Sequence, residues 1–134
     1  NTSVSVCDWD RIVCDSNTGR VTILRFLGNL MDGTLPDELG LLTGMKELHF
    51  GFNPGLRGPI PPSIGKMTAL ERLYVWNASL TTVPSELGNC SSLIAVDLTD
   101  NQIDGPLPAE LSNLKNVDTA YFDGNPKLHC PVSP

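Results

Sequence analysis

The chain has 134 residues, a formal net charge of −6 and 40% hydrophobic residues. This length fits a single domain, and the negative charge argues against binding to nucleic acid or to an anionic membrane surface. No run of about 20 apolar residues occurs, so we expect no membrane-spanning helix and no direct membrane insertion. The absence of an initiator methionine and of a signal-like apolar start is typical of a mature or excised segment of a larger parent protein.

Residues 1–20 precede the repeated part of the chain and contain two of its four cysteines, Cys7 and Cys14. Between them lie three apolar residues, Trp9, Ile12 and Val13. The first unit of a stacked array has no neighbour on its outer side, and these side chains could cover it. We therefore expect residues 1–20 to form an N-terminal cap.

From Val21 the sequence repeats with a period of 23 to 25 residues, and the stretch LIAVDLTDNQIDGPLPAELSNLK at 93–115 shows the unit best. A strand-like alternation is followed by an asparagine, a Gly-x-x-Pro turn and a short helical turn, which fits neither one helix nor one strand. One such unit cannot bury its apolar side alone, so several must stack. We assign five repeats and a C-terminal cap or linker start, at residues 21–44, 45–69, 70–92, 93–116, 117–128 (partial) and 129–134.

An asparagine follows the predicted strand in four repeats, at Asn29, Asn53, Asn101 and Asn125, whereas the third repeat has Ala78. A buried side-chain amide can bond backbone groups of its own repeat and of the neighbouring one, which forms a ladder. A missing rung leaves buried groups unpaired, at a cost of about 1–3 kcal/mol. We therefore expect a weak point at Ala78 and a locally different chain path after it.

The repeats resemble the leucine-rich repeat family, specifically its plant-type extracellular subclass with the L-x-G-x-I-P segment. The resemblance implies an α/β-type solenoid, a right-handed leucine-rich repeat superhelix. In it a parallel β-sheet forms the concave face, and short 3-10 or helical turns and loops form the convex face. No metal and no cofactor are expected.

The segment from Cys7 to Cys14 is similar to the C-x-W-x-G-V-x-C cap that opens such domains, except that Arg11 replaces the usual glycine. The resemblance implies a disulfide between Cys7 and Cys14. With the glycosylation triplets, it also favours a secreted protein or one on the extracellular face of the cell surface.

Equivalent positions of stacked strands, about 4.8 Å apart, form columns across a sheet. Here the columns carry aromatic and basic side chains near the middle and acidic ones towards the C-terminal end. Aromatic residues and arginine are typical anchors of protein interfaces. We predict a partner-binding surface formed by Arg25, His49, Phe52, Arg72, Tyr74, Trp76, Asp97, Tyr121 and Asp123.

Two alternatives remain for this surface. The aromatic side chains could simply cover the sheet, because scattered apolar surface residues are ordinary. The acidic residues could hold calcium, but no loop has the ligand spacing of a calcium site, and we favour a solvated acidic surface.

Three N-x-S/T triplets make Asn1, Asn77 and Asn89 candidates for N-glycosylation. We expect Asn89 on the convex side. Asn77 borders the predicted binding surface, where a glycan would shield Trp76.

The two remaining cysteines differ in setting. Cys90 occupies an apolar repeat position, which predicts a buried thiol. Cys130 falls where the resemblance places C-terminal cap cysteines, and it is either free or paired beyond Pro134.

No Ser/His/Asp set, metal-ligand cluster or phosphate loop surrounds either histidine, so we assign no catalytic residue and expect no enzyme. The leading hypothesis is an extracellular recognition module that binds a protein or peptide partner through the concave sheet face. The alternative is a structural subunit of an extracellular matrix, cell wall or filament, with self-assembly through that face. Ice binding, which some members of the family perform, needs a regular array of threonine-like side chains that these irregular columns lack.

Overall fold

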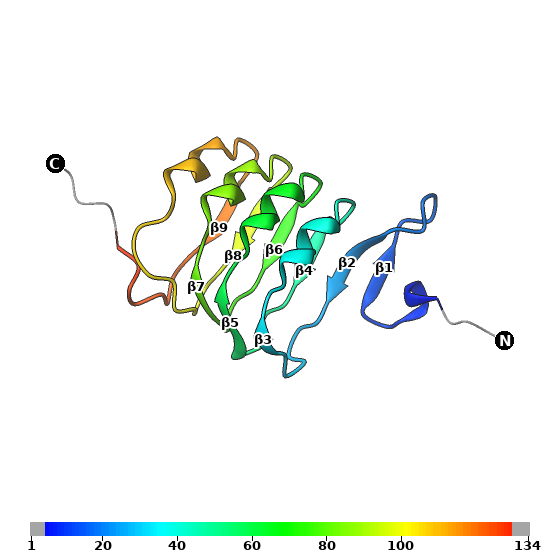
Figure 1. Cartoon of the computed structure of the whole chain (residues 1–134), viewed down its shortest axis with the longest axis horizontal. Coiled ribbons are helices and arrows are strands. Elements are labelled where there is room, and N and C mark those ends of the chain that lie inside the picture. The colour runs from blue at the N-terminus through cyan, green and yellow to red at the C-terminus, as the bar shows by residue number, and fades with distance from the viewer. Residues whose placement is uncertain (1–4, 130–134) are drawn as a thin grey trace.

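The computed structural model describes residues 5–129, which form a right-handed solenoid of coils stacked side by side (Figure 1). The long sheet runs through all coils in the order β1-β2-β4-β6-β8-β9. Its strands are β1 (Ile12–Cys14), β2 (Val21–Arg25), β4 (Glu47–His49), β6 (Arg72–Tyr74), β8 (Ala95–Asp97) and β9 (Thr119–Tyr121). All pairs from β2 to β9 are parallel, which confirms the predicted sheet.

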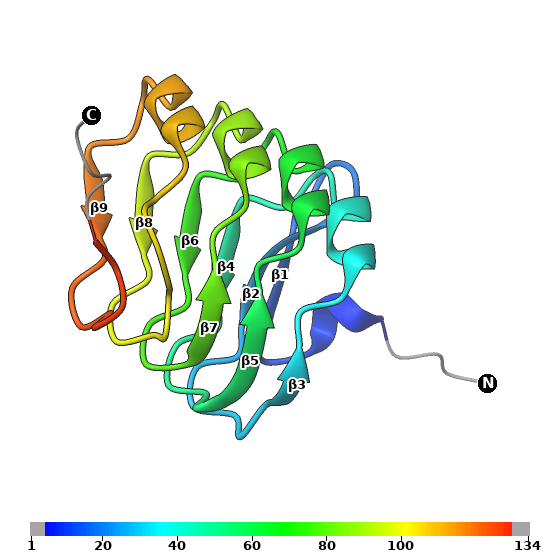
Figure 2. The ribbon, with the colours of Figure 1, turned by 60° about the vertical axis from the view of Figure 1, so that its left-hand side comes forward.

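A second parallel sheet and a row of 3-10 helices complete the coils (Figure 2). The second sheet consists of β3 (Asp32–Thr34), β5 (Gly55–Pro59) and β7 (Ser79–Thr82), and the sequence analysis did not predict it. The helices are η1 (Val6–Asp8) in the cap and η2 (Asp37–Leu41), η3 (Pro62–Lys66), η4 (Ser85–Asn89) and η5 (Ala109–Asn113) in the coils. Within residues 5–129 no helix has the length and apolar character needed to cross a membrane.

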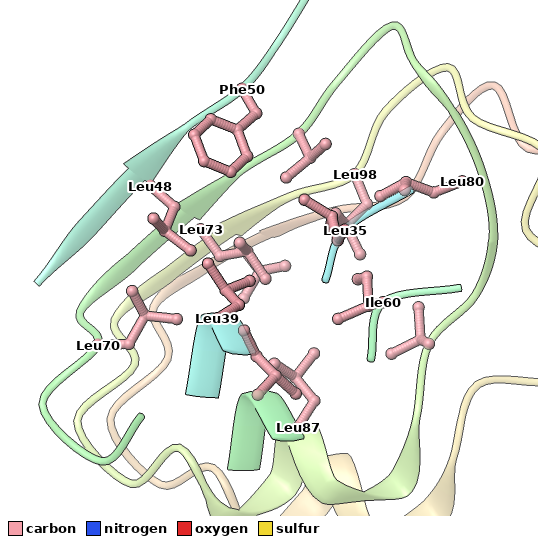
Figure 3. Close-up of a cluster of buried hydrophobic side chains, with 14 of the residues drawn as sticks. Leu35, Leu39, Leu48, Phe50, Ile60, Leu70, Leu73, Leu80, Leu87 and Leu98 are labelled. Carbon is pink, nitrogen blue, oxygen red and sulfur yellow. The ribbon is translucent and has the colours of Figure 1, made fainter. Parts of the chain in front are cut away.

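The core is a ribbon of apolar side chains shared between neighbouring coils. Figure 3 shows Leu48 and Leu73 of the long sheet facing Leu39 and Leu87 of the 3-10 helices. Leu80 of the second sheet closes the ribbon on the third side. Burial of such side chains contributes roughly 1.5–3 kcal/mol each, so the stacking of coils supplies the stability that no single coil has.

A proline precedes each of the helices η2 to η5, and η2, η3 and η4 also contain a glycine. Pro36, Pro61, Pro84 and Pro108 precede the helices, and a proline is suited to this extended position because its φ is fixed near −65°. Gly88 of η4 lies so close to η5 that an added Cβ would overlap the backbone oxygen of Glu110. The glycine therefore sets how closely adjacent coils approach.

The asparagine ladder is present wherever an asparagine occurs in a coil with a preceding neighbour. Asn101 donates to the backbone oxygens of Val75 and Leu98 at 2.7 and 3.0 Å and accepts from the Leu80 amide at 3.0 Å. Asn53 and Asn125 make equivalent bonds to the preceding coil. Each rung thus satisfies buried backbone groups of two coils at once.

Ala78 interrupts this ladder, and the chain beside it is irregular. Ala78 is buried and supplies no amide, and the neighbouring Ser79 donates its hydroxyl to the Pro54 backbone oxygen at 2.8 Å. The pairing of β5 with β7 shifts by one residue between Gly58 and Pro59. The predicted change of path in the third coil is therefore found in the second sheet.

The N-terminal cap consists of η1 and β1, which pairs antiparallel with β2. A disulfide joins Cys7 to Cys14. Arg11 donates to the side-chain oxygen of Asn29 at 2.6 Å and to the Leu27 backbone oxygen at 3.4 Å. Arg11, which replaces the usual glycine, thus bonds Asn29, the first asparagine of the ladder, which has no preceding coil to bond.

One expectation for the cap was wrong. Trp9 is 56% exposed and Val13 is 36% exposed, so these side chains do not cover the outer side of the first coil, and Ile12 is only half-buried. The cap covers the long sheet through backbone pairing of β1 instead. Asn1 and Cys130 lie outside the described residues.

Candidate functional site

The outward side of the long sheet, called the concave face here, brings the predicted residues together in columns. Strand register pairs Arg25 with His49, His49 with Tyr74, Tyr74 with Asp97, and Asp97 with Tyr121. Glu47 and Arg72 are paired in the next column. Side chains alternate between the two sides of a strand, so both columns face away from the core.

Glu47 organises the charges at the centre of this face. Its two carboxylate oxygens lie 3.0 Å from Arg72 Nη1 and 2.8 Å from His49 Nε2. Burial on its own would raise the pKa of Glu47, but the hydrogen bond from His49 and the charges of His49 and Arg72 outweigh it, so the pKa lies below its ordinary value. The glutamate is therefore a carboxylate that balances the positive charge around it.

Four rings lie on this face, one of which is His49 of the charged group: His49, Phe52, Tyr74 and Trp76, called the aromatic patch here. The centroids of His49 and Tyr74 are 4.9 Å apart and those of Phe52 and Trp76 are 5.2 Å apart, both edge to face. The indole of Trp76 lies over Gly51, where a Cβ would be 2.6 Å from the ring. A glycine in the second coil thus leaves room for the tryptophan of the third.

Phe52 has an unusual backbone conformation. Its φ is 60°, and the equivalent residues Gly28, Asn77, Asp100 and Gly124 also have positive φ, between 52° and 74°. Glycine, asparagine and aspartate tolerate this conformation, whereas a bulky residue adopts it at a cost of roughly 1–2 kcal/mol. Phe52 is 53% exposed, so core burial does not explain why an aromatic residue occupies this position.

The two ends of the concave face carry opposite charge. Arg25 is exposed at the end of β2. At the other end lie Asp97, Asp100 and Asp123, called the acidic end here; Asp97 accepts from the Thr99 amide at 3.0 Å, and the carboxylate of Asp100 lies over Gly124. Tyr121 is 52% exposed beside them. No group of three His, Cys, Asp or Glu side chains within residues 5–129 is arranged to hold a metal ion.

Sequence reasoning missed Glu47, although a signal was present. Glu47 and Arg72 occupy the same position of adjacent repeats, and opposite charges at such positions meet across neighbouring strands. The positive φ at the repeat position of Phe52 also had a signal in the sequence, because the other residues at this position are glycine, asparagine or aspartate.

The predicted modification sites and the remaining thiol lie as follows. Asn77 is half-buried at the edge of the aromatic patch, and Asn89 is exposed at the end of η4. Cys90 is buried, its thiol donates to the Ile64 backbone oxygen at 3.1 Å, and burial raises its pKa to about 11.

Comparison with known proteins adds an independent line of evidence. The profile of the Leucine Rich Repeat family matches residues 92–114. A polygalacturonase inhibitor of Pyrus communis is 37% identical over 67 residues, covering 50% of this chain and 20% of the relative. Receptor-like protein 41 of Arabidopsis thaliana is 31% identical over 118 residues, covering 84% of this chain and 13% of the relative. The chain spans a fifth or less of the length of these relatives.

Solved structures of similar fold include two that bear on function. One is the leucine-rich repeat ectodomain of the Arabidopsis thaliana receptor kinase GASSHO1/SCHENGEN3 in complex with CASPARIAN STRIP INTEGRITY FACTOR 2. This chain matches that ectodomain with a TM-score of 0.84 and 29% sequence identity, and the match covers 89% of this chain and 14% of the ectodomain chain. The other is a plant ice-binding protein, with a TM-score of 0.84 at 30% identity over 90% of this chain and 39% of that one.

Proposed function

Because the chain is a leucine-rich repeat protein of the plant-type extracellular subclass, we propose that it is an extracellular recognition module that binds a protein or peptide partner through the concave face. The proposed contact residues are Arg25, His49, Phe52, Arg72, Tyr74, Trp76, Asp97, Tyr121 and Asp123. The module acts outside the cell, either secreted or displayed at the cell surface.

The observation that carries the proposal is Phe52. An aromatic side chain is kept half-exposed, in a backbone conformation that disfavours it, and edge to face with Trp76. Leu30 is also apolar, exposed and of positive φ, so strain alone does not mark a binding residue. What distinguishes Phe52 is its edge-to-face contact with Trp76 within the aromatic patch. Clustered aromatic side chains that remain partly accessible, as Phe52 does beside half-buried Tyr74 and Trp76, are also the usual anchors of binding surfaces.

The relatives support the same class of function. They are described as receptor-like proteins and inhibitors, and one similar ectodomain was solved in a complex. These roles belong to much longer proteins, so the resemblance supports recognition in general and leaves the partner of this chain open.

Ice binding is the second candidate, because one similar structure is a plant ice-binding protein. The paired column from Arg25 to Tyr121 mixes basic, aromatic and acidic side chains in place of a repeated small residue. Such an irregular column offers no repeated side chain that could order water molecules into the regular lattice of ice. We therefore place recognition of a partner first.

The test compares two substitutions that relieve the same backbone strain in different places. Phe52→Gly removes the proposed anchor, and Leu30→Gly is the matched control, because Leu30 has a φ of 55° and is 87% exposed outside the strand columns. Each immobilised protein is panned against a displayed library of random heptapeptides. We expect wild-type and Leu30→Gly to enrich the same peptides, and Phe52→Gly to bind them at least about tenfold more weakly.

Three outcomes would overturn the proposal. Equal binding by Phe52→Gly and wild-type would remove the aromatic patch from the interface. Failure to enrich peptides, together with ordered self-association in sedimentation that Phe52→Gly abolishes, would favour a structural subunit instead. Inhibition of ice recrystallisation by wild-type protein would favour the second candidate.

A further inference from the structure

The charged and aromatic side chains of the concave face indicate which side chains a bound partner should carry. We infer that this face takes an extended peptide segment that crosses the strands, with an acidic side chain at Arg25 and a basic side chain four residues away at Asp97. Between them the segment carries an apolar side chain over the aromatic patch. The inference rests on the proposed function and adds a chemical pattern and a spacing to it.

The first step is the separation of charge. Arg25 is exposed at one end of a column whose fourth member is Asp97. The outward-facing positions of the fourth and fifth coils carry no lysine or arginine. They carry three aspartates instead, Asp97, Asp100 and Asp123. A bound segment therefore meets positive charge at the first coil and negative charge at the fourth and fifth, which favours a partner with the complementary arrangement.

The second step concerns the centre, where the charges are already matched. Glu47 lies within 3.0 Å of Arg72 and 2.8 Å of His49, so a partner gains little by bringing a charge there. Beside this group the rings of His49 and Tyr74 meet edge to face, and those of Phe52 and Trp76 do the same. Ring surfaces of this kind favour an apolar side chain, because its burial removes apolar area from water.

The third step is the spacing. Neighbouring strands lie about 4.8 Å apart, so the three strand steps from Arg25 to Asp97 span about 14 Å. An extended peptide rises about 3.4 Å per residue, so four residues span nearly the same distance. Alternate side chains of an extended peptide face the same way, which brings the first and fifth over Arg25 and Asp97. The third then falls between His49 and Tyr74.

The test uses the displayed random heptapeptide library and reads the positions of charged residues in the selected peptides. For wild-type protein we expect peptides with opposite charges four residues apart, and an apolar residue midway, to be enriched by about fivefold over the unselected library. Adjacent opposite charges serve as the internal control and should not be enriched.

Two charge reversals identify which end of the peptide lies where. Arg25→Glu makes both proposed charge contacts acidic and should select basic residues at both peptide positions. Asp97→Lys makes both contacts basic and should select acidic residues at both peptide positions. Asp97 also bonds the Thr99 amide, so Asp123→Lys, at an exposed residue, is a second variant for the acidic end if Asp97→Lys folds poorly.

The outcomes separate this inference from the proposed function. Peptides that depend on Phe52 but show no spaced charge pair, or whose charges do not respond to Arg25→Glu, would overturn the inference and leave the recognition role intact. Peptides that bind wild-type and Phe52→Gly equally would overturn the proposed function and the inference with it.

Discussion

Glu47 decides how the central residues of the concave face interact. Its carboxylate is the shared acceptor for Arg72 and His49, which come from neighbouring strands, and its side chain is only 19% exposed. Without it, His49 would lose this acceptor, and Arg72 would keep only the longer contact of 3.6 Å with Glu71. The interaction therefore holds β4 to β6 through side chains as well as through backbone bonds.

Replacement of Glu47 by glutamine should change the pH dependence of stability. The pKa of Glu47 in the folded protein lies below its ordinary value of 4.5. A lowered folded pKa means that the carboxylate stabilises the fold above the unfolded pKa, and that this stabilisation is lost as the pH falls through the folded pKa. We expect Glu47→Gln to be less stable than wild-type at about pH 6, with a difference that shrinks steadily towards about pH 3.

Urea denaturation across this pH range measures the effect. Glu71→Gln is the control, because Glu71 contacts the same arginine at 3.6 Å but is 37% exposed, and its removal should cost little at any pH. A stability difference between Glu47→Gln and wild-type that stays constant with pH would show that the carboxylate charge is not the source.

At the residue scale, the columns of the concave face could be predicted because repeat register and strand register coincide. Arg25, His49 and Tyr74 are equivalent in the sequence and paired in the sheet. The contacts between columns could not be predicted in the same way. The overlap of Trp76 with Gly51 depends on a rotamer that no repeat position specifies.

At the scale of the element, the second sheet shows where repeat patterns stop being informative. β3, β5 and β7 are three to five residues long and contain glycine or threonine in place of a regular apolar alternation. Their pairing follows from the stacking of the coils, and an ion pair of 2.7 Å between Arg57 and Asp32 crosses it. Such strands leave little signal of their own in the sequence.

The asparagine ladder leads to a prediction about the third coil. Ala78→Asn places a side-chain amide where Asn101 has one in the next coil, within reach of the Val75 backbone oxygen and of the preceding coil. Each new bond contributes about 0.5–1.5 kcal/mol, so we expect the free energy of unfolding to rise by about 1 kcal/mol. The Asn77 glycosylation triplet is retained, because its middle residue is free to vary.

Chemical denaturation of three variants tests the rung. Asn101→Ala removes an existing rung and should lower the free energy of unfolding by about 2–3 kcal/mol. Ala78→Gln carries the same amide on a longer stem and should give no gain, because the extra methylene crowds the buried site and carries the amide past the groups that an asparagine reaches. A loss of stability in Ala78→Asn would mean that the irregular pairing of β5 and β7 has closed the site to an amide.

At the scale of the whole molecule, burial is uneven along the solenoid. The strand residues Leu48, Leu73 and Val96 are 0–2% exposed, whereas Leu24 in the first coil is half-buried and Ala120 in the last is exposed. At the C-terminal end an apolar cavity of about 80 Å³ opens beside Ala120 and Phe122. In a solenoid each coil contacts only its neighbours, so the end coils have fewer stabilising contacts than the middle ones.

Native-state hydrogen exchange should therefore show a gradient from the middle to the ends. The amides of Phe26 and Val75 make nearly equal bonds across the long sheet, at 2.8 Å to the His49 oxygen and 2.9 Å to the Asp97 oxygen. Bond geometry thus cannot separate them, and a difference in exchange reports how often each coil opens. We expect Val75 to exchange at least about tenfold more slowly than Phe26, and Leu128 to exchange faster than both. Equal protection of Phe26 and Val75 would show that the coils open as one unit. In that case the proposed binding surface, which extends from the first coil to the last, would be as rigid at its ends as at its centre.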